Sequence, residues 1–408
     1  MDPIKQNIAK TKSLLSGLQD VKKNFEIVST SIRREVEDIC NLQAKGMPVI
    51  PEIEYKSIIS GGVSSSQIAE IKRRGSLIIR NVFDEQQAQE WNDEIGDYIS
   101  RNNYLNKSIE KQHMDQYFSR LKSAAPQIFG IYWSKPQMLA RQSESMSNTK
   151  KFLNALWDVS CKSGDEFDPN HDYIYADRIR RREPGDETLG LSPHIDGGSF
   201  ERWLDPAFQK VYSSIFNGDY SSYDPWKAAF RTQTREYKSP AVCSAFRTFQ
   251  GWTALTSQGP SDGTLSLIPI TSSMSYILLR ALQEDIPPDN LCDAEPGRPL
   301  NISLKYHADL LEALVSIQEV KPGDTVWWHP DLTHSVADKH SGKDYSNVMF
   351  IGASPRCQKN LNYAKLQAQT FLKGKSPPDF APEDYEVDFS GRFVADELTD
   401  LGRAQMVL

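Results

Sequence analysis

Three side chains have the types and the surroundings to bind a metal ion. His194 and Asp196 stand in Ser-Pro-His-Ile-Asp-Gly-Gly, and His334 stands far downstream in Asp-Leu-Thr-His-Ser. Two imidazoles and one carboxylate form the ligand set of non-haem Fe(II) sites in oxygenases, which keeps adjacent coordination positions open. A His-x-Asp pair also occurs by chance, so the prediction depends on the elements that would position it.

The segments around these residues are typical of strand ends. Residues 173–179 predict a strand, residues 183–186 (Glu-Pro-Gly-Asp) a turn, and the Gly-Gly after Asp196 ends regular structure. Further on, the turn at residues 321–324 precedes the apolar run 325–328, and His334 follows as that strand ends. A jelly roll brings such strand ends together. We therefore predict an α+β fold with a mainly β core, namely a double-stranded β-helix (cupin-like jelly-roll barrel) with flanking helices.

Several ordered segments resemble the landmarks of the phytanoyl-CoA hydroxylase-like superfamily of iron and 2-oxoglutarate dioxygenases. They are Glu-Pro-Gly before His194-Ile-Asp196, Gly-Trp-Thr-Ala-Leu at 251–255, Asp-Gly-Thr-Leu at 262–265, and Pro-Gly-Asp before His334-Ser. More narrowly, Tyr-Ala-Asp-Arg-Ile-Arg-Arg-Arg at 175–182, His-Ile-Asp-Gly-Gly-Ser-Phe-Glu-Arg-Trp at 194–203 and Pro-Pro-Asp-Phe at 377–380 look like the YbiU-like family, over most of residues 50–408. The resemblance implies Fe(II), 2-oxoglutarate as cosubstrate and O2, and it names no substrate.

The resemblance also bears on which histidine is the third ligand. His329, beside two tryptophans, and His340, in a polar loop, compete with His334. The pattern of the superfamily places the ligand in His-Ser after a Gly-Asp, which favours His334.

A dianionic cosubstrate beside Asp196 requires a cation for its distal carboxylate, ideally an arginine. Relatives place that arginine roughly ten to fourteen residues past the distal histidine, where this chain has Tyr-Ser-Asn347-Val. We predict Arg178 or Arg247 as the replacement, with Lys343 and Arg356 as outside candidates.

The alternatives for these residues remain open. Arg178 and Arg180 could instead form one solvated, ion-paired face of an edge strand. Arg247 and Trp252 are five positions apart and share a face only if the strand bulges at Gly251. Trp252 is expected to flank the cosubstrate, but it could equally be a core residue.

Polar side chains among aromatic ones are candidates for substrate binding. Gln137 and Arg141 follow Tyr132-Trp133, and Arg202 lies in Ser-Phe-Glu-Arg-Trp. A small polar or charged metabolite would suit such linings, and a structural role fits both segments equally well.

The chain divides into four predicted parts. Residues 1–45 predict an amphipathic helix, 46–170 a helical region with an early strand, 171–356 the β-helix core with an insertion at 201–239, and 357–408 a helix and a wrapping tail. The insertion is placed to be a lid. The apolar stripe of the first helix steps by three and four (Leu14, Leu18, Val21, Phe25, Val28, Ile32, Val36 and Ile39). It would pack on the protein's own body or, as a coiled coil, form a homodimer.

Bulk properties exclude some classes of function. A net charge of -7 argues against nucleic acid as a general partner. The five scattered cysteines, without Cys-x-x-Cys, indicate reduced thiols, and neither a signal peptide nor a membrane-spanning run is evident. We expect a cytoplasmic protein with no membrane partner.

The sequence therefore predicts an Fe(II)- and 2-oxoglutarate-dependent dioxygenase that hydroxylates, desaturates or otherwise oxidises a small molecule. Two alternatives remain. One is a cupin-like metalloenzyme that uses no 2-oxo acid, and the other is a jelly-roll binding protein without turnover.

Overall fold

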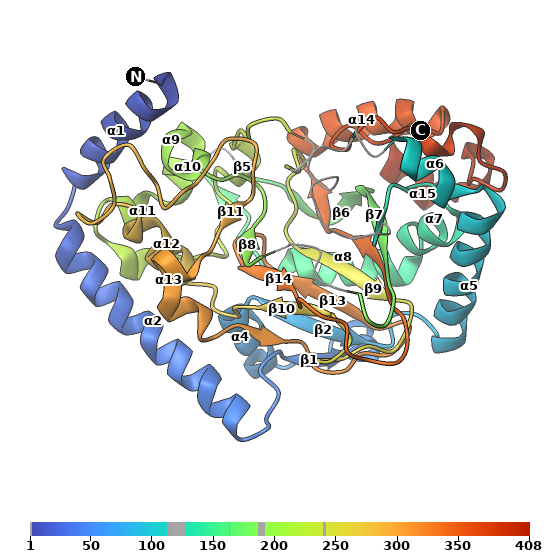
Figure 1. Ribbon diagram of the computed structural model, residues 1–408, viewed down its shortest axis with the longest axis horizontal. Helices are drawn as coiled ribbons and strands as arrows, with labels where there is room; N and C mark the ends of the chain where they lie inside the picture. Colours follow the sequence, from blue (N-terminus) through green and yellow to red (C-terminus); the bar gives the residue numbers. More distant parts are fainter. Residues whose placement is uncertain (1, 112–113, 115–126, 163, 187–191, 240–241) are drawn as a thin grey trace.

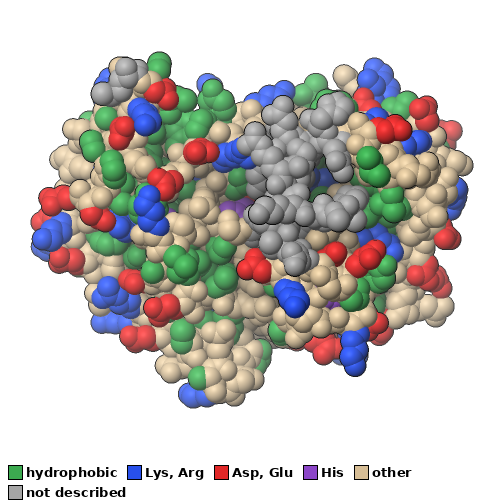
Figure 2. Space-filling model, in the orientation of Figure 1, with side chains coloured by type: hydrophobic (Ala, Val, Ile, Leu, Met, Phe, Trp, Pro, Cys, Tyr) green, Lys and Arg blue, Asp and Glu red, His purple; other side chains and the backbone are tan. Residues whose placement is uncertain are grey.

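The computed structural model describes residues 2–111, 114, 127–162, 164–186, 192–239 and 242–408. The fold is mixed α+β, with the strands in the middle and helices gathered at both ends of the molecule (Figure 1). Among the described residues, no helix is both long and apolar enough to span a membrane. On the face shown in Figure 2, Lys and Arg side chains are interspersed with Asp and Glu side chains.

The larger sheet has seven strands. Their order is β1 (Glu52–Glu54), β2 (Ser76–Arg80), β13 (Thr325–Trp328), β9 (Gln250–Ala254), β15 (Ser346–Ile351), β7 (Ala176–Arg182) and β3 (Ile128–Phe129). β1 and β2 are parallel, and the other neighbours are antiparallel.

The second sheet has five short strands, all antiparallel. Their order is β11 (Leu300–Asn301), β8 (His194–Ile195), β14 (His334–Val336), β10 (Leu265–Leu267) and β12 (Val315–Ser316). Two further pairs join β6 (Asp168–Tyr173) to β16 (Ser354–Arg356) and β4 (Ser160–Cys161) to β5 (Gly164–Asp165).

The two large sheets share one apolar core. Alternation along β9, β13 and β15 directs Trp252, Val326 and Val348 into the same cluster as Ile195 and Leu265 of the smaller sheet. The opposite face of the larger sheet packs in a second cluster with the helices around it. The functional residues described below lie between the sheets.

One glycine is required by this packing. Gly251 lies on the outer face of β9, opposite Trp327 of β13. A Cβ at this position would lie 2.3 Å from the Trp327 ring, so no larger residue fits without displacing the indole.

The helices form groups that can be followed in Figure 1. At one end lie α1 (Pro3–Ser16), α2 (Val21–Ala44), α12 (Ser273–Arg280) and α13 (Leu304–Leu311), and at the other α5 (Glu85–Arg101), α6 (Tyr104–Lys111), α7 (Lys135–Arg141), α14 (Gln358–Leu372) and α15 (Asp400–Met406). The remaining α-helices are α3 (Tyr55–Ile59), α4 (Ser65–Arg74), α8 (Glu144–Ala155) and, in the insertion, α9 (Glu201–Leu204), α10 (Pro206–Val211) and α11 (Ser213–Phe216).

The N-terminal segment is two helices and not the single helix predicted. α1 ends at Ser16, and the side chain of Asp20 caps α2 by accepting a hydrogen bond from the Lys23 amide at 3.0 Å. The later part of the apolar stripe, including Val28 and Ile39, is buried in the main core, where α2 packs on α12 and α13. That part of the stripe is therefore covered within the chain.

The strands next to the candidate ligands also differ in detail from the prediction. The strand predicted over 173–179 is split, because β6 pairs with β16 whereas β7 pairs with β15 and β3. His334 does not end the strand 325–328 but opens β14 in the other sheet.

The early strand expected within residues 46–170 is present as β2, between the helices α4 and α5. A capping box between Ser64 and Gln67 starts α4, and Asp84 caps α5. Parts of the predicted regions 1–45, 46–170 and 171–356 lie outside the described residues, namely 1, 112–113, 115–126, 163, 187–191 and 240–241.

Candidate metal centre

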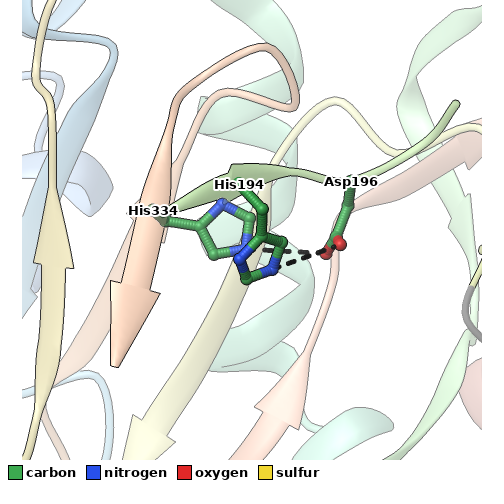
Figure 3. A group of neighbouring side chains, drawn as sticks. All are labelled: His194, Asp196 and His334. Carbon is green, nitrogen blue, oxygen red and sulfur yellow. Dashed lines mark ion pairs between the residues drawn. The ribbon is translucent and has the colours of Figure 1, made fainter. Parts of the chain in front are cut away.

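His194, Asp196 and His334 point toward one another from β8 and β14 (Figure 3). One ligand atom of each residue lies within 4.8 Å of the others. The Nε2 atoms of both histidines are 3.6 Å from oxygens of Asp196. His194 and His334 are register partners on adjacent strands, which explains how residues so distant in sequence meet.

Backbone carbonyls set the orientation of both imidazoles. His194 Nδ1 lies 2.6 Å from the Ser192 carbonyl, and His334 Nδ1 lies 3.2 Å from the Leu332 carbonyl. A proton on Nδ1 that is donated to these carbonyls leaves the lone pair on Nε2, directed at Asp196. The sequence folds this way because each histidine begins a short strand directly after the carbonyl it contacts.

The protonation states suit a divalent metal. Burial, together with the neighbouring His334, lowers the pKa of His194 to about 4, so its ring is neutral at pH 7. Burial works toward a higher pKa of Asp196, but His334 and His194 hold it below its ordinary value. A neutral imidazole and an ionised carboxylate are the forms that bind metal.

Gln250 holds the carboxylate of Asp196 in place, a role not foreseen from the sequence. Its Nε2 donates to Asp196 Oδ2 at 3.2 Å, while its Oε1 accepts from Trp328 Nε1 at 2.6 Å. The indole N–H can only donate, so it fixes which end of the amide faces Asp196. The available signal was alternation, since Gln250 stands two residues before Trp252 on the same face of β9.

The three candidate ligands line a cavity between the two sheets. The larger sheet contributes cationic and aromatic side chains and the smaller sheet contributes the histidines. The lining includes Arg178, Arg180, His194, Asp196, Arg247, Gln250, Trp252, Leu265, Trp328, His334, Val336 and Phe350. The cavity also contains both residues predicted as cosubstrate anchors and Trp252.

Arg180 is a buried cation without a carboxylate partner among the described residues. It is 2% exposed, and its Nη2 donates to two uncharged groups, Gln258 Oε1 at 3.1 Å and Ser346 Oγ at 3.2 Å. Its buried Nε has no hydrogen-bond partner in the part of the chain that the structure describes. Burial and the nearby charge of Arg182 lower the pKa of Arg180 to about 9, which leaves the group charged at pH 7. An anion in the cavity would supply what is missing.

The environment of Arg180 corrects one interpretation of its strand. β7 is not an edge strand, because β3 covers it, and Arg180 is not solvated. Arg178 alone of the pair keeps some exposure, with Nε 3.7 Å from Asp177 Oδ1 and its guanidinium over the Phe380 ring at 4.9 Å.

The position of Asn347 also has a consequence. Alternation along β15 turns Asn347 outward, where its Nδ2 donates to Asn92 Oδ1 at 2.8 Å. Its neighbour Ser346 faces the cavity side and accepts from Arg180. The cavity therefore receives no group from Asn347, whereas Arg180 of the adjacent strand β7 lines it. Lys343 and Arg356 are exposed and do not line the cavity.

Arg247 and Trp252 both line the cavity although they are five positions apart. β9 begins at Gln250, so Arg247 precedes the regular strand and the alternation rule does not apply to it. No bulge at Gly251 is needed, because β9 and β13 stay in register there.

His329 and His340 lie elsewhere. The ring of His329 stacks on Trp157 with centroids 4.7 Å apart, and its Nε2 is 3.1 Å from the Pro225 carbonyl. His340 Nδ1 accepts from the Gly342 amide at 3.2 Å. Neither belongs to the group of candidate ligands.

The three residues predicted to bind substrate do not line the cavity with the histidines. Gln137 closes the capping box of α7, and its Nε2 donates to the carbonyls of Ile131 and Asp177. Arg141 is 1% exposed and donates to the carbonyls of Tyr132 and Asp177. These contacts support the segment that carries Arg178.

Arg202 adjoins the centre from behind. Its Nη1 pairs with Asp331 Oδ1 at 2.7 Å, and its Nη2 donates to the backbone carbonyl of Asp196 at 2.9 Å. These contacts fit a positioning role for Arg202.

Fold and site together define an α+β protein with a candidate centre of two histidines and one carboxylate, typical of non-haem iron proteins. A family model described as Gig2-like matches residues 2–408, and the chain belongs to that family. It is 44% identical to the uncharacterized protein YbiU of Escherichia coli (strain K12), over 96% of this chain and 93% of that protein.

Two solved structures extend the comparison. A protein from Salmonella typhimurium LT2, described as a candidate oxidoreductase, is 42% identical and superimposes with a TM-score of 0.95, covering 100% of this chain and 98% of that chain. GlcNAc inducible gene 2 of Candida albicans is 28% identical with a TM-score of 0.80, covering 98% of this chain and 88% of that chain. The whole fold is thus shared with these proteins.

Proposed function

We propose that the protein is an Fe(II)- and 2-oxoglutarate-dependent dioxygenase that oxidises a small organic molecule. The observation that carries this proposal is the convergence of two Nε2 atoms and a carboxylate on one point at a cavity wall. Such a set binds iron on one face and leaves the cavity side open. When bound, the iron and a 2-oxo acid use O2 to oxidise a C–H bond of the substrate, with succinate and CO2 as coproducts.

The chain's own residues would prepare this chemistry. The carbonyls of Ser192 and Leu332 hold both imidazoles in the ligating tautomer, and Gln250 orients Asp196. Trp252 and Phe350 line the same cavity and would limit the water around the reacting groups.

Arg180 is the residue that we propose as anchor of the distal carboxylate of 2-oxoglutarate, in place of Arg178 or Arg247. Arg182, two residues further along β7, donates to the carbonyl of Ala337, three residues past His334. This contact joins β7 to the residue that follows β14, and Arg180 lines the same cavity as the three candidate ligands. The proposal is that one 2-oxoglutarate reaches from the iron to Arg180 within this cavity. Its uncompensated charge, with Ser346 beside it, fits one carboxylate.

A double-stranded β-helix is part of the proposal. The shared core of the two large sheets, with the candidate centre between them, supports this architecture. The buried charge of Arg180 favours this function over a cupin-like enzyme that uses no 2-oxo acid, and succinate formation distinguishes it from a binding protein without turnover.

The test uses purified protein reconstituted anaerobically with Fe(II). We expect His194→Ala, Asp196→Ala and His334→Ala each to lose bound iron, because two remaining ligands do not hold a labile divalent ion. His329→Gln is the matched control and should retain it. Addition of 2-oxoglutarate should produce the weak visible charge-transfer band of a chelated 2-oxo acid, and admission of O2 should yield succinate slowly.

The variant Arg180→Met tests whether Arg180, rather than Arg178 or Arg247, anchors the distal carboxylate of 2-oxoglutarate. It should weaken 2-oxoglutarate binding by about 2–4 kcal/mol, as measured by titration of the band, and leave iron affinity unchanged. Wild-type affinity in Arg180→Met would exclude this anchor, and a metal-replete protein with neither band nor succinate would contradict the proposed function.

A further inference from the structure

Arg247 presents a second cation to the cavity. Its side chain is partly exposed and lines the cavity that holds His194 and Asp196. Among the described residues, no hydrogen bond or ion pair engages its guanidinium. Arg247 and Asp196 line two cavities together, the one that holds the histidines and a second, smaller one.

The side chain is held in one orientation. Its stem packs on Gly352, where an added Cβ would lie 2.9 Å from Arg247 Cδ. Its guanidinium lies over the ring of Tyr175, 5.3 Å from the centroid. Stacking covers one face of the planar group and leaves its N–H edge for a ligand. An arginine fixed in this way is suited to bidentate recognition of a planar anion.

The other charged groups of the cavity are already engaged. Arg178 has Asp177 Oδ1 at 3.7 Å, and Arg180 is committed to the proposed cosubstrate. Asp379 accepts hydrogen bonds from the Ser244 amide, the Ser244 hydroxyl and the Tyr175 hydroxyl. Burial raises the pKa of Asp379, against the lowering effects of these hydrogen bonds and of Arg247, and no ion pair joins Asp379 to Arg247 among the described residues. The charge of Arg247 is therefore left for the substrate.

We infer that the substrate is an organic acid whose carboxylate binds Arg247. This inference rests on the proposed function and names the substrate class for that site. Because Arg247 and Asp196 line the same cavity, we expect the oxidised carbon to lie near the carboxylate of the acid. The remainder of the acid would lie against Trp252, Val242 and Phe350, which line the same cavity. A phosphate is disfavoured, since its second negative charge would face Asp177 and Asp196.

The test is calorimetric titration of anaerobic protein in the presence of Fe(II) and 2-oxoglutarate. The probes are butyrate, hexanoate and octanoate, each compared with its primary amide, and butyl phosphate. The amide keeps the size and shape of the acid and removes the charge. At least one carboxylate should bind wild type about tenfold or more tightly than its amide.

Two variants locate the effect. Arg247→Met should lose the preference for the acid while 2-oxoglutarate keeps its wild-type affinity. Arg356→Met, which removes an exposed arginine outside the cavity, should keep the preference.

Several results would overturn the inference. The first is a preference for the acid over its amide that remains in Arg247→Met, and the second is that no acid binds wild type more tightly than its amide. The third is tighter binding of butyl phosphate than of any acid. The fourth is a loss of 2-oxoglutarate affinity in Arg247→Met equal to the loss in Arg180→Met. Failure of the proposed function is seen separately as a missing charge-transfer band. If acids bind in an Arg247-dependent way but the band is missing, the acid site at Arg247 is supported and the proposed dioxygenase function is contradicted.

Discussion

Buried arginines line the cavities on two sides of Asp196, and the two sides differ in how the arginine charge is compensated. Behind the candidate ligands, Arg202 and Arg231 share the carboxylate of Asp331, at 2.7 and 2.8 Å. In the cavity in front, the hydrogen-bond acceptors of Arg180 among the described residues are Gln258 and Ser346, and both are uncharged. All three arginines are nearly inaccessible to solvent.

The difference separates a structural role from a binding role. Asp331 also accepts from the hydroxyl of Tyr212, and the two arginines hold its pKa well below the ordinary value despite burial. That cluster is complete and connects the insertion to the segment before His334. A buried cation without a carboxylate is costly, and a bound anion would remove the cost. We therefore assign a structural role to Arg202 and Arg231 and a ligand-binding role to Arg180.

The largest effect is expected at Asp331. Asp331→Ala leaves two buried guanidinium groups without compensation and should lower the free energy of unfolding by about 3–5 kcal/mol. Urea denaturation of metal-free protein measures it, with Asp344→Ala, an exposed aspartate, as control. If Asp331→Ala lowered the free energy of unfolding no more than Asp344→Ala does, the structural role assigned to the Asp331 cluster would be wrong.

Glu386 is a buried carboxylate that forms no ion pair with any described residue, and it gives a second test of the comparison. Glu386 accepts hydrogen bonds from the amides of Tyr132 and Trp133 and from the hydroxyl of Tyr98. Burial outweighs these bonds and raises the pKa of Glu386 from 4.5 to about 7. Above pH 4.5 the unfolded chain releases this proton before the folded protein does.

The stability of wild type relative to Glu386→Gln should therefore fall as the pH rises from about 4.5 to 7, and then level off. The full change is roughly 3 kcal/mol. Urea denaturation of both proteins across this range gives the difference. Parallel curves would mean that Glu386 keeps an ordinary pKa in the folded state.

The candidate ligands were predictable because their local sequence is informative. A turn before His194, a Gly-Gly after Asp196 and a Gly-Asp turn before His334 are short-range signals. The break between α1 and α2 was missed because the apolar periodicity continues across it, although Asp20 is a good cap.

The anchor could not be chosen from the sequence. Arg178, Arg180 and Arg182 alternate onto one face of β7, and periodicity treats them alike. Which of them is buried, exposed or paired depends on β3, β15 and the opposite sheet, which are distant in sequence. The same holds for Asn347 and Ser346, because a register shift of one residue exchanges the face of each. Long-range burial decides these roles.

The smallest effect on stability, and the sharpest test of the comparison, is expected at Arg180 itself. In protein free of metal and 2-oxoglutarate, Arg180→Met removes a buried charge that no carboxylate compensates. Gln258 Oε1 would keep hydrogen bonds from Ser346 and Thr264, at 2.8 and 3.1 Å, so no acceptor is orphaned. The free energy of unfolding should stay the same or rise by up to about 1 kcal/mol. Arg202→Met, which breaks a complete cluster, should lower it by about 3 kcal/mol or more. If Arg180→Met destabilised the protein as much as Arg202→Met, Arg180 would be as structural as Arg202, and its missing partner would no longer point to a ligand.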